Sequence, residues 1–255
     1  MLWKKGWWDM RWIFLIGLAW IFGAYGLTFG AGDYDAGRWA ARLHRSASLS
    51  ESERQALNNY QGQAWALWFK MLLSFMCADL AVLLGAACLM TECPYQPSQD
   101  STRMFTFSLP PSRRKVLLSQ ATVGFGQLFL AVLFSSLLIP IFARFNGQWF
   151  SWSDTLIYLS LTILGAAVFF CFAFLMTVIL GNWFAVFVLV EGAVFALFLP
   201  YIPFRTRPWW NILGLMAGES YFYHGQIPWL GLLISILLSA VFMFAAIRIF
   251  ERRDL

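Results

Sequence analysis

Two acidic residues are the side chains best placed to do chemistry in this chain, because each lies near the middle of a long apolar segment. Asp79 falls within residues 64–90 and Glu191 within residues 182–203. An ionised carboxylate at the centre of a membrane costs roughly 2.5–3.5 kcal/mol, so such a residue usually faces protein or a water-filled cavity. We expect both to line a translocation pathway. The alternative is that each is protonated or hydrogen-bonded to a neighbouring helix and only holds the helices together.

Other chemistry has little to build on in this sequence. It contains no G-x-x-x-x-G-K-[ST] phosphate-binding loop and no H-E-x-x-H zinc motif. The two histidines, His44 and His224, fall on separate polar connections, which gives a metal site or a nucleophile–histidine pair no basis. None of the cysteines suggests a disulfide or a metal cluster; they are Cys77, Cys88, Cys93 and Cys171. We expect no catalytic residue, metal or bound cofactor in this chain, which is not expected to be an enzyme.

Composition indicates the class of protein. Hydrophobic residues make up 60% of the chain and charged residues 12%, about half the charged content of roughly 25% found in soluble proteins. The 14 Trp and 26 Phe supply aromatic side chains of the kind that gather at membrane interfaces. A soluble chain this apolar would expose a large sticky surface. We predict a polytopic membrane protein with a single transmembrane domain over residues 1–255. The formal net charge of +5 fits membrane topology better than nucleic-acid binding.

Six segments are long enough to cross a membrane, which takes about 20 apolar residues in a helix. Their approximate bounds are 12–30, 64–90, 116–142, 155–180, 182–203 and 228–250. The fold class is therefore predicted to be all-α with six transmembrane helices. The third segment ends near Pro140 and the fifth near Pro200 and Pro203, which fits helix termination. Gly181-Asn182 is the only break between the fourth and fifth segments, so these two should form a tight helical hairpin.

Basic residues near the helix ends indicate the orientation. If the N-terminus is cytoplasmic, the cytoplasmic ends of the predicted helices carry more Lys and Arg than their outer ends, as is usual in membrane proteins. We expect a location in the cell inner (plasma) membrane, with both termini and residues 91–115 cytoplasmic and with residues 31–63 and 204–227 outside. The first apolar segment could instead be a secretory signal peptide, but it is long for one and no clear cleavage site follows it.

Three features lie where the chain is expected to meet the membrane surface. Residues 209–217 are apolar but too short to span, so a re-entrant or interfacial segment is predicted between helices five and six, with a turn at residues 218–220. Lys70 lies near the outer end of its helix, from which its side chain can extend outward. Residues 1–11 mix tryptophan with lysine, as in a segment lying among lipid headgroups, or as in an ordinary helix flank.

The polar stretch 91–115 is compact, partly hydrophobic and basic, which suits contact with another protein. Its residues follow one another in a defined order: Glu92, Thr102, Leu109-Pro110 and Ser112-Arg113. The chain ends in Phe250-Glu251-Arg252-Arg253-Asp254-Leu255. This order, this ending and the six predicted spans resemble the membrane subunit of an ABC-2-type transporter, the exporter-like class of ATP-binding-cassette permeases. The resemblance covers the whole chain.

The resemblance implies a transmembrane permease subunit that couples ATP hydrolysis by a separate ABC ATPase subunit to export of a substrate. Two permease copies or paralogues would form the pathway as a homodimer or heterodimer within membrane lipid, and ATP and Mg would bind the partner ATPase. Each permease would dock a short cytoplasmic coupling helix, about residues 98–109, on that ATPase and move with it. The coupling residues implied are Glu92, Thr102, Arg103, Phe105, Leu109, Pro110, Ser112 and Arg113.

Within this coupling segment, Phe105 and its apolar neighbours would anchor the contact, while Arg103 and Arg113 would set its register. Alternatively, the aromatic residues pack on their own lipid interface. The sequence departs from the family pattern at Ser101, where glycine is usual, and at Gln120, where lysine is common. Three other functions stay open: an integral membrane enzyme, a secondary carrier, and a non-transporting membrane anchor or sensor.

Overall fold

The computed structural model describes residues 7–8, 10–23, 70, 72–88, 113–145, 151–198 and 212–252. Within these ranges all regular structure is helical and strands are absent. The first two apolar helices are Met10–Gly23 and Leu72–Ala87. The later elements are α4 (Arg113–Phe145), α5 (Trp152–Leu180), α6 (Trp183–Phe198), α7 (Ile212–Met216), α8 (Glu219–His224) and α9 (Trp229–Arg252). The all-α prediction is confirmed for the described residues.

Three of the described helices, α4, α5 and α9, are long and apolar enough to cross a membrane. This agrees with a membrane protein. The apolar helices Met10–Gly23 and Leu72–Ala87 and the apolar part of α6, Phe184–Ala196, are each shorter than a full span. The predicted spans that include them extend past the described residues.

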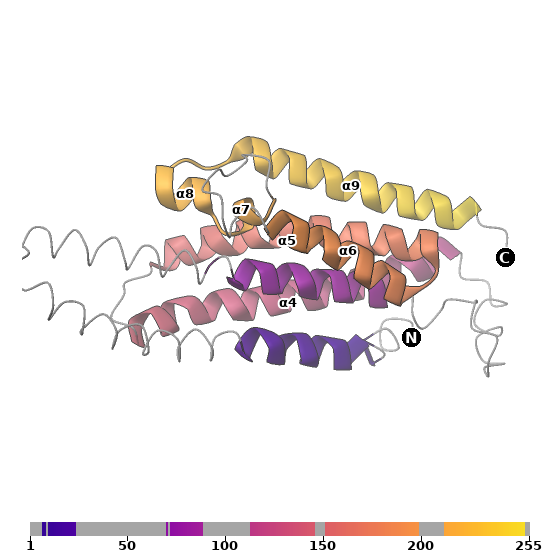
Figure 1. Ribbon diagram of the computed structural model, residues 1–255, viewed down its shortest axis with the longest axis horizontal. Coiled ribbons are helices and arrows are strands. Elements are labelled where there is room, and N and C mark those ends of the chain that lie inside the picture. Colours follow the sequence, from indigo (N-terminus) through magenta and orange to yellow (C-terminus); the bar gives the residue numbers. More distant parts are fainter. Residues whose placement is uncertain are drawn as a thin grey trace, which may run out of the picture.

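Helix α5 lies at the centre of the arrangement. It packs against α4, α6, α7 and α9, and α9 runs beside it (Figure 1). The Met10–Gly23 helix packs at Gly17 against Leu80 of the Leu72–Ala87 helix. Helices α7 and α8 lie together at the end of the bundle opposite the last turn of α9 (Figure 1). At the end of the bundle where α9 finishes, the Cys88 sulfur lies 3.8 Å from the Met10 sulfur and 3.6 Å from the Gln120 carbonyl oxygen, so its single S–H can donate to either. These contacts tie three helices together.

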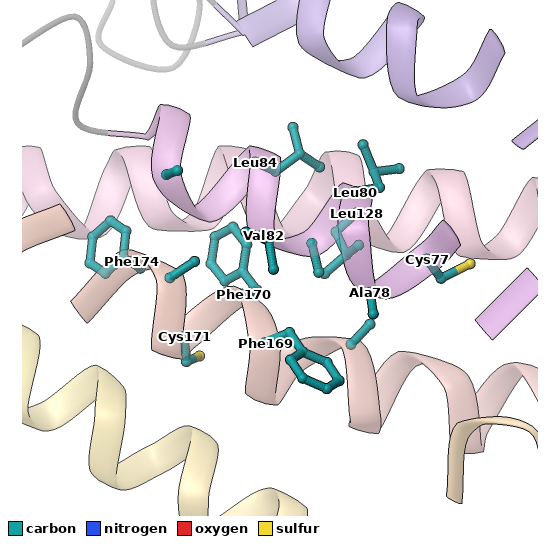
Figure 2. Packing of buried hydrophobic residues seen from close by; sticks show 14 of the residues in the cluster. Cys77, Ala78, Leu80, Val82, Leu84, Leu128, Phe169, Phe170, Cys171 and Phe174 are labelled. Carbon is teal, nitrogen blue, oxygen red and sulfur yellow. The ribbon is translucent and has the colours of Figure 1, made fainter. Parts of the chain in front are cut away.

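The core lies between the Leu72–Ala87 helix, α4 and α5. Figure 2 shows Val82, Leu128 and Phe170 gathered in this space. A side-chain carbon added at Gly85 would lie 2.6 Å from the backbone oxygen of Phe170. Gly85 therefore lets the Leu72–Ala87 helix approach the backbone of α5 closely, the usual role of small residues between membrane helices.

The ends of α5 follow ordinary capping rules. The Ser151 hydroxyl accepts a hydrogen bond from the Asp154 backbone N–H at 3.1 Å, which caps the first turn. At the other end Gly181 adopts a left-handed conformation with φ of 65°, and its N–H donates to the Thr177 carbonyl. Helix α6 begins two residues later, at Trp183. The predicted break at Gly181-Asn182 is confirmed.

Two sequence-based boundaries of α4 are wrong. The helix continues through Pro140 to Phe145 instead of ending near the proline. Proline removes one N–H and crowds the carbonyl four residues earlier, here that of Ser136, but membrane helices tolerate this where neighbouring groups satisfy the backbone. The helix also begins at Arg113, so the last three residues of the predicted loop 91–115 are helical.

The connection before α9 contains two short helices. Gly218, with φ of 69°, separates α7 from α8, which confirms a turn at this residue. The prediction that Glu219 and Ser220 continue the turn is wrong, because both belong to α8. Helix α7 packs into the bundle: Met216 is fully buried, and its carbonyl accepts a hydrogen bond from the Thr162 hydroxyl at 3.1 Å.

Candidate functional site

The structure brings Asp79 and Glu191 together. The two carboxyl groups, one from the Leu72–Ala87 helix and one from α6, lie close enough to interact electrostatically. Helix α6 runs obliquely across the bundle in Figure 1. Residues far apart in the sequence therefore form one acidic pair.

The pair lies at a partly open seam of the bundle, and both residues are half-buried. On the Leu72–Ala87 helix, Met76 and Leu83 share the less buried face with Asp79. On α6, the neighbouring residue Val190 is fully buried and holds the helix against the core. The carboxyl groups thus sit at the boundary between the packed core and the surroundings of the chain.

The electrostatics of this pair restrict its charge. Two ionised carboxylates in contact repel strongly where water is scarce, so one shared proton or a bound cation is needed to hold them together. In addition, Asp79 Oδ1 and Glu191 Oε1 are buried and have no hydrogen-bond partner. These two oxygens leave unused acceptor capacity at the seam, which a cationic or hydrogen-bond-donating group could fill.

Lys70 does not extend outward as expected; it is buried, with 7% of its surface exposed. Its ammonium lies 3.2 Å from the centre of the Phe222 ring of α8, close to the Asp154 carboxylate of α5. The prediction is wrong because α8 covers the site and offers an aromatic face and a nearby charge instead of water.

Further hydrogen bonds fix this end of the bundle. The Lys70 carbonyl accepts from the Ser74 hydroxyl at 2.7 Å and from the Tyr158 hydroxyl at 3.3 Å. The Tyr221 hydroxyl of α8 donates to Asp154 at 3.4 Å. These contacts join the Leu72–Ala87 helix, α5 and α8, so the cluster stabilises the packing of these helices.

The coupling residues predicted from the sequence lie outside the described residues, with one exception. Those outside are Glu92, Thr102, Arg103, Phe105, Leu109, Pro110 and Ser112. Arg113 is the first residue of α4 and therefore not a loop residue. Beside it, Arg114 and Lys115 are exposed in the first turn. The predicted coupling helix at 98–109 stays a prediction.

Sequence reasoning missed a set of buried polar groups on α4. Gln127 is fully buried and neither its amide nitrogen nor its amide oxygen has a hydrogen-bond partner. The Gln120 side-chain oxygen and the Ser136 hydroxyl are also buried without a partner. The spacing of seven residues between the glutamines, two helical turns, was a readable signal that they share a helix face.

The cysteines and acidic residues form no metal centre in the part of the chain that the structure covers. Cys77, Cys88 and Cys171 are buried free thiols. Burial in apolar surroundings keeps such thiols inert and gives them the packing role of small hydrophobic residues.

In comparisons with known proteins, no family model, no curated protein and no solved structure matches this chain.

Proposed function

We propose that this chain is the permease subunit of an ATP-binding-cassette exporter, with six membrane-spanning helices and cytoplasmic termini. The observation that carries the proposal furthest is that Asp79 and Glu191 lie close enough to interact. A pair of carboxyl groups at the seam of an otherwise apolar bundle is costly, and such residues characteristically serve a pathway. The order of residues in the 91–115 stretch supports the same conclusion.

A mechanical link from an ATPase to the pair is supported by the helix arrangement. The residues between Cys88 and Arg113 connect the Leu72–Ala87 helix to α4, at the end where Cys88 contacts Met10 and Gln120. Asp79 lies nine positions before Cys88, about 13 Å along a rigid helix. A push on this connection would therefore displace Asp79 relative to α6 and open or close the acidic pair.

The pathway role is tested by Asp79→Asn and Glu191→Gln. Each substitution removes the charge and keeps the shape, so we expect lower substrate export or lower substrate-stimulated ATPase activity in the complex, with normal assembly. Glu251→Gln, on the exposed last turn of α9, is the matched control. Normal transport by both variants at equal expression would return the pair to a purely structural role.

The coupling role is tested by the double variant Phe105→Ala with Arg113→Ala. A buried aromatic anchor at an interface is worth about 2 kcal/mol or more. We therefore expect the variant to be inserted and stable but to lose its ATPase partner during purification, or to hydrolyse ATP without transport. Trp229→Ala, on the exposed start of α9 at the opposite end, is the control. Retained partner together with retained transport would contradict the coupling role and the family assignment.

Dependence on a partner gives a third test. Since the sequence has no phosphate-binding loop, the purified chain should not hydrolyse ATP, and native co-purification should recover a nucleotide-binding subunit. ATP turnover by the isolated chain at a transporter-like rate, with contaminating ATPases excluded, would favour a membrane enzyme. Intact complexes without any ATPase would favour an anchor or sensor.

A further inference from the structure

Arg11, in the first turns of the Met10–Gly23 helix, lies on two tryptophan rings. Its guanidinium carbon is 4.1 Å from the centre of the Trp8 ring and 5.3 Å from that of the Trp12 ring. Both rings are largely exposed, Trp8 by 58% and Trp12 by 62%. The three side chains form a small cationic and aromatic surface.

The cation of this surface is only partly satisfied. Arg11 Nε is buried and has no hydrogen-bond partner. A guanidinium carries five N–H donors in a planar fork, and stacking on aromatic rings uses its face. The donors at the terminal nitrogens, rather than the buried Nε, are the ones open to a ligand. A ligand with several acceptor oxygens and negative charge would satisfy them.

The position of Arg11 suits a ligand at the membrane surface. The neighbouring residue Met10 contacts Cys88, at the end of the bundle where α4 begins and α9 ends. Exposed basic residues gather at this end, namely Arg114, Lys115, Arg248 and Arg252. Tryptophan side chains prefer the boundary between hydrocarbon and headgroups, and basic residues near that boundary attract anionic lipid.

We propose that Trp8, Arg11 and Trp12 form a binding site for the phosphate of an anionic phospholipid. The guanidinium donates to the phosphate oxygens, and the indole rings lie along the upper acyl chain and glycerol region. This site is separate from the acidic pair and does not depend on the proposed transport function.

Arg248 provides the matched comparison. Its guanidinium carbon lies 5.1 Å from the ring of Phe244 on α9, so it has one aromatic neighbour where Arg11 has two. It is also exposed, whereas Arg11 is half-buried. If general attraction between basic residues and an anionic surface explained lipid binding, the two arginines would contribute equally.

The test uses the full chain in bilayers of phosphatidylcholine alone or mixed with phosphatidylglycerol, with Arg11→Gln, Arg11→Lys and Arg248→Gln. Native mass spectrometry counts retained phosphatidylglycerol, and thermal unfolding reports stabilisation by it. For Arg11→Gln we expect retention to weaken by more than the roughly fivefold share of one basic residue near a membrane surface. Arg11→Lys should recover part of it, because charge returns without the planar fork. Arg248→Gln should lose no more than that fivefold share.

Two further arms identify the source of the phosphate and the role of a neighbour. Inorganic phosphate added to detergent-solubilised chain should not reproduce the stabilisation; if it does, the site takes free phosphate and the lipid assignment fails. Asp9 is an acidic residue two positions before Arg11 and lies outside the described residues, so Asp9→Asn is included. Lipid retention should fall in the Arg11 variants and not in Asp9→Asn. Equal retention by Arg11→Gln and the wild type, or equal loss in the Arg11 and Arg248 variants, would overturn the proposal.

Discussion

Helices α5 and α9 are similarly apolar, run side by side and occupy opposite extremes of burial. In their most apolar stretches 67% of the positions of α5 are buried, against 11% in α9. In water such an exposed helix would be unstable, but in a bilayer the lipid solvates it as well as protein does. Apolarity in this chain therefore reports the solvent around a helix and not its place in the fold.

What separates the two helices is the detail of their contacts. Helix α5 offers Gly165 as a seat for the Met216 side chain, and its Thr162 hydroxyl donates to a carbonyl of another element. On α9, the hydroxyls of Ser235 and Ser239 donate to carbonyls one turn earlier in the same helix. Helix α5 also has internal hydroxyl bonds, from Ser160 and Thr177, but its Thr162 and Tyr158 hydroxyls donate to other elements, which those of Ser235 and Ser239 on α9 do not.

The largest difference is expected for a buried ring against an exposed one. Phe170 of α5 is fully buried and stacks with Phe174, whereas Phe244 of α9 is 61% exposed. Phe170→Ala should leave a cavity and lower the free energy of unfolding by roughly 3 kcal/mol, near the lower end of the soluble range because lipid also solvates the separated helix. Phe244→Ala should change it little. Thermal unfolding in matched bilayers measures both variants. Similar losses of stability would contradict the proposed difference between α5 and α9.

A second expected difference concerns glycine. A side-chain carbon at Gly85 meets the backbone oxygen of Phe170 on α5 at 2.6 Å, whereas at Gly231 of α9 it meets a flexible Leu215 methyl at 2.9 Å. Backbone cannot rotate away, so Gly85→Ala should cost about 1–3 kcal/mol of stability and Gly231→Ala less. Unfolding by denaturant compares the two. Gly126→Ala, with open space around the new carbon, is the control.

The smallest expected difference concerns a hydroxyl. Thr162→Val removes the hydrogen bond to the Met216 carbonyl and should cost about 0.6 kcal/mol, the average for such bonds between membrane helices. Ser239→Ala removes only a bond within α9 and should be close to neutral. Hydrogen exchange at α7 offers a local measurement, in which Thr162→Val alone should speed exchange. Unchanged exchange would show that packing at Gly165 holds α7 without the hydroxyl.

Features governed by local rules could be predicted from the sequence. Gly181 marks the end of α5, because only glycine enters the left-handed conformation without strain. Gly218 marks the turn between α7 and α8 for the same reason. The prediction that the helix ends near Pro140 is wrong, because the cost of a proline in a helix depends on neighbouring groups whose positions the sequence does not give.

Tertiary features were less accessible. Asp79 and Glu191 are each recognisable as an acidic residue in an apolar segment. Neither segment indicates that α6 packs near the Leu72–Ala87 helix. The burial of Lys70 depends on the Phe222 ring of α8, which arrives from a segment far along the chain. Gln127 escaped notice because an uncharged amide carries no charge to mark it within an apolar segment.

Helix α7 shows a consequence for the way this chain is made. Five residues cannot form a stable helix alone, because nucleation costs more than so few backbone hydrogen bonds return. Helix α7 therefore needs the surface that Gly165 and Thr162 provide. The ribosome synthesises α5 before α7, so the receiving surface is already present when α7 emerges. A permuted chain that began at α7 would present this segment to the insertion machinery with nothing to fold against.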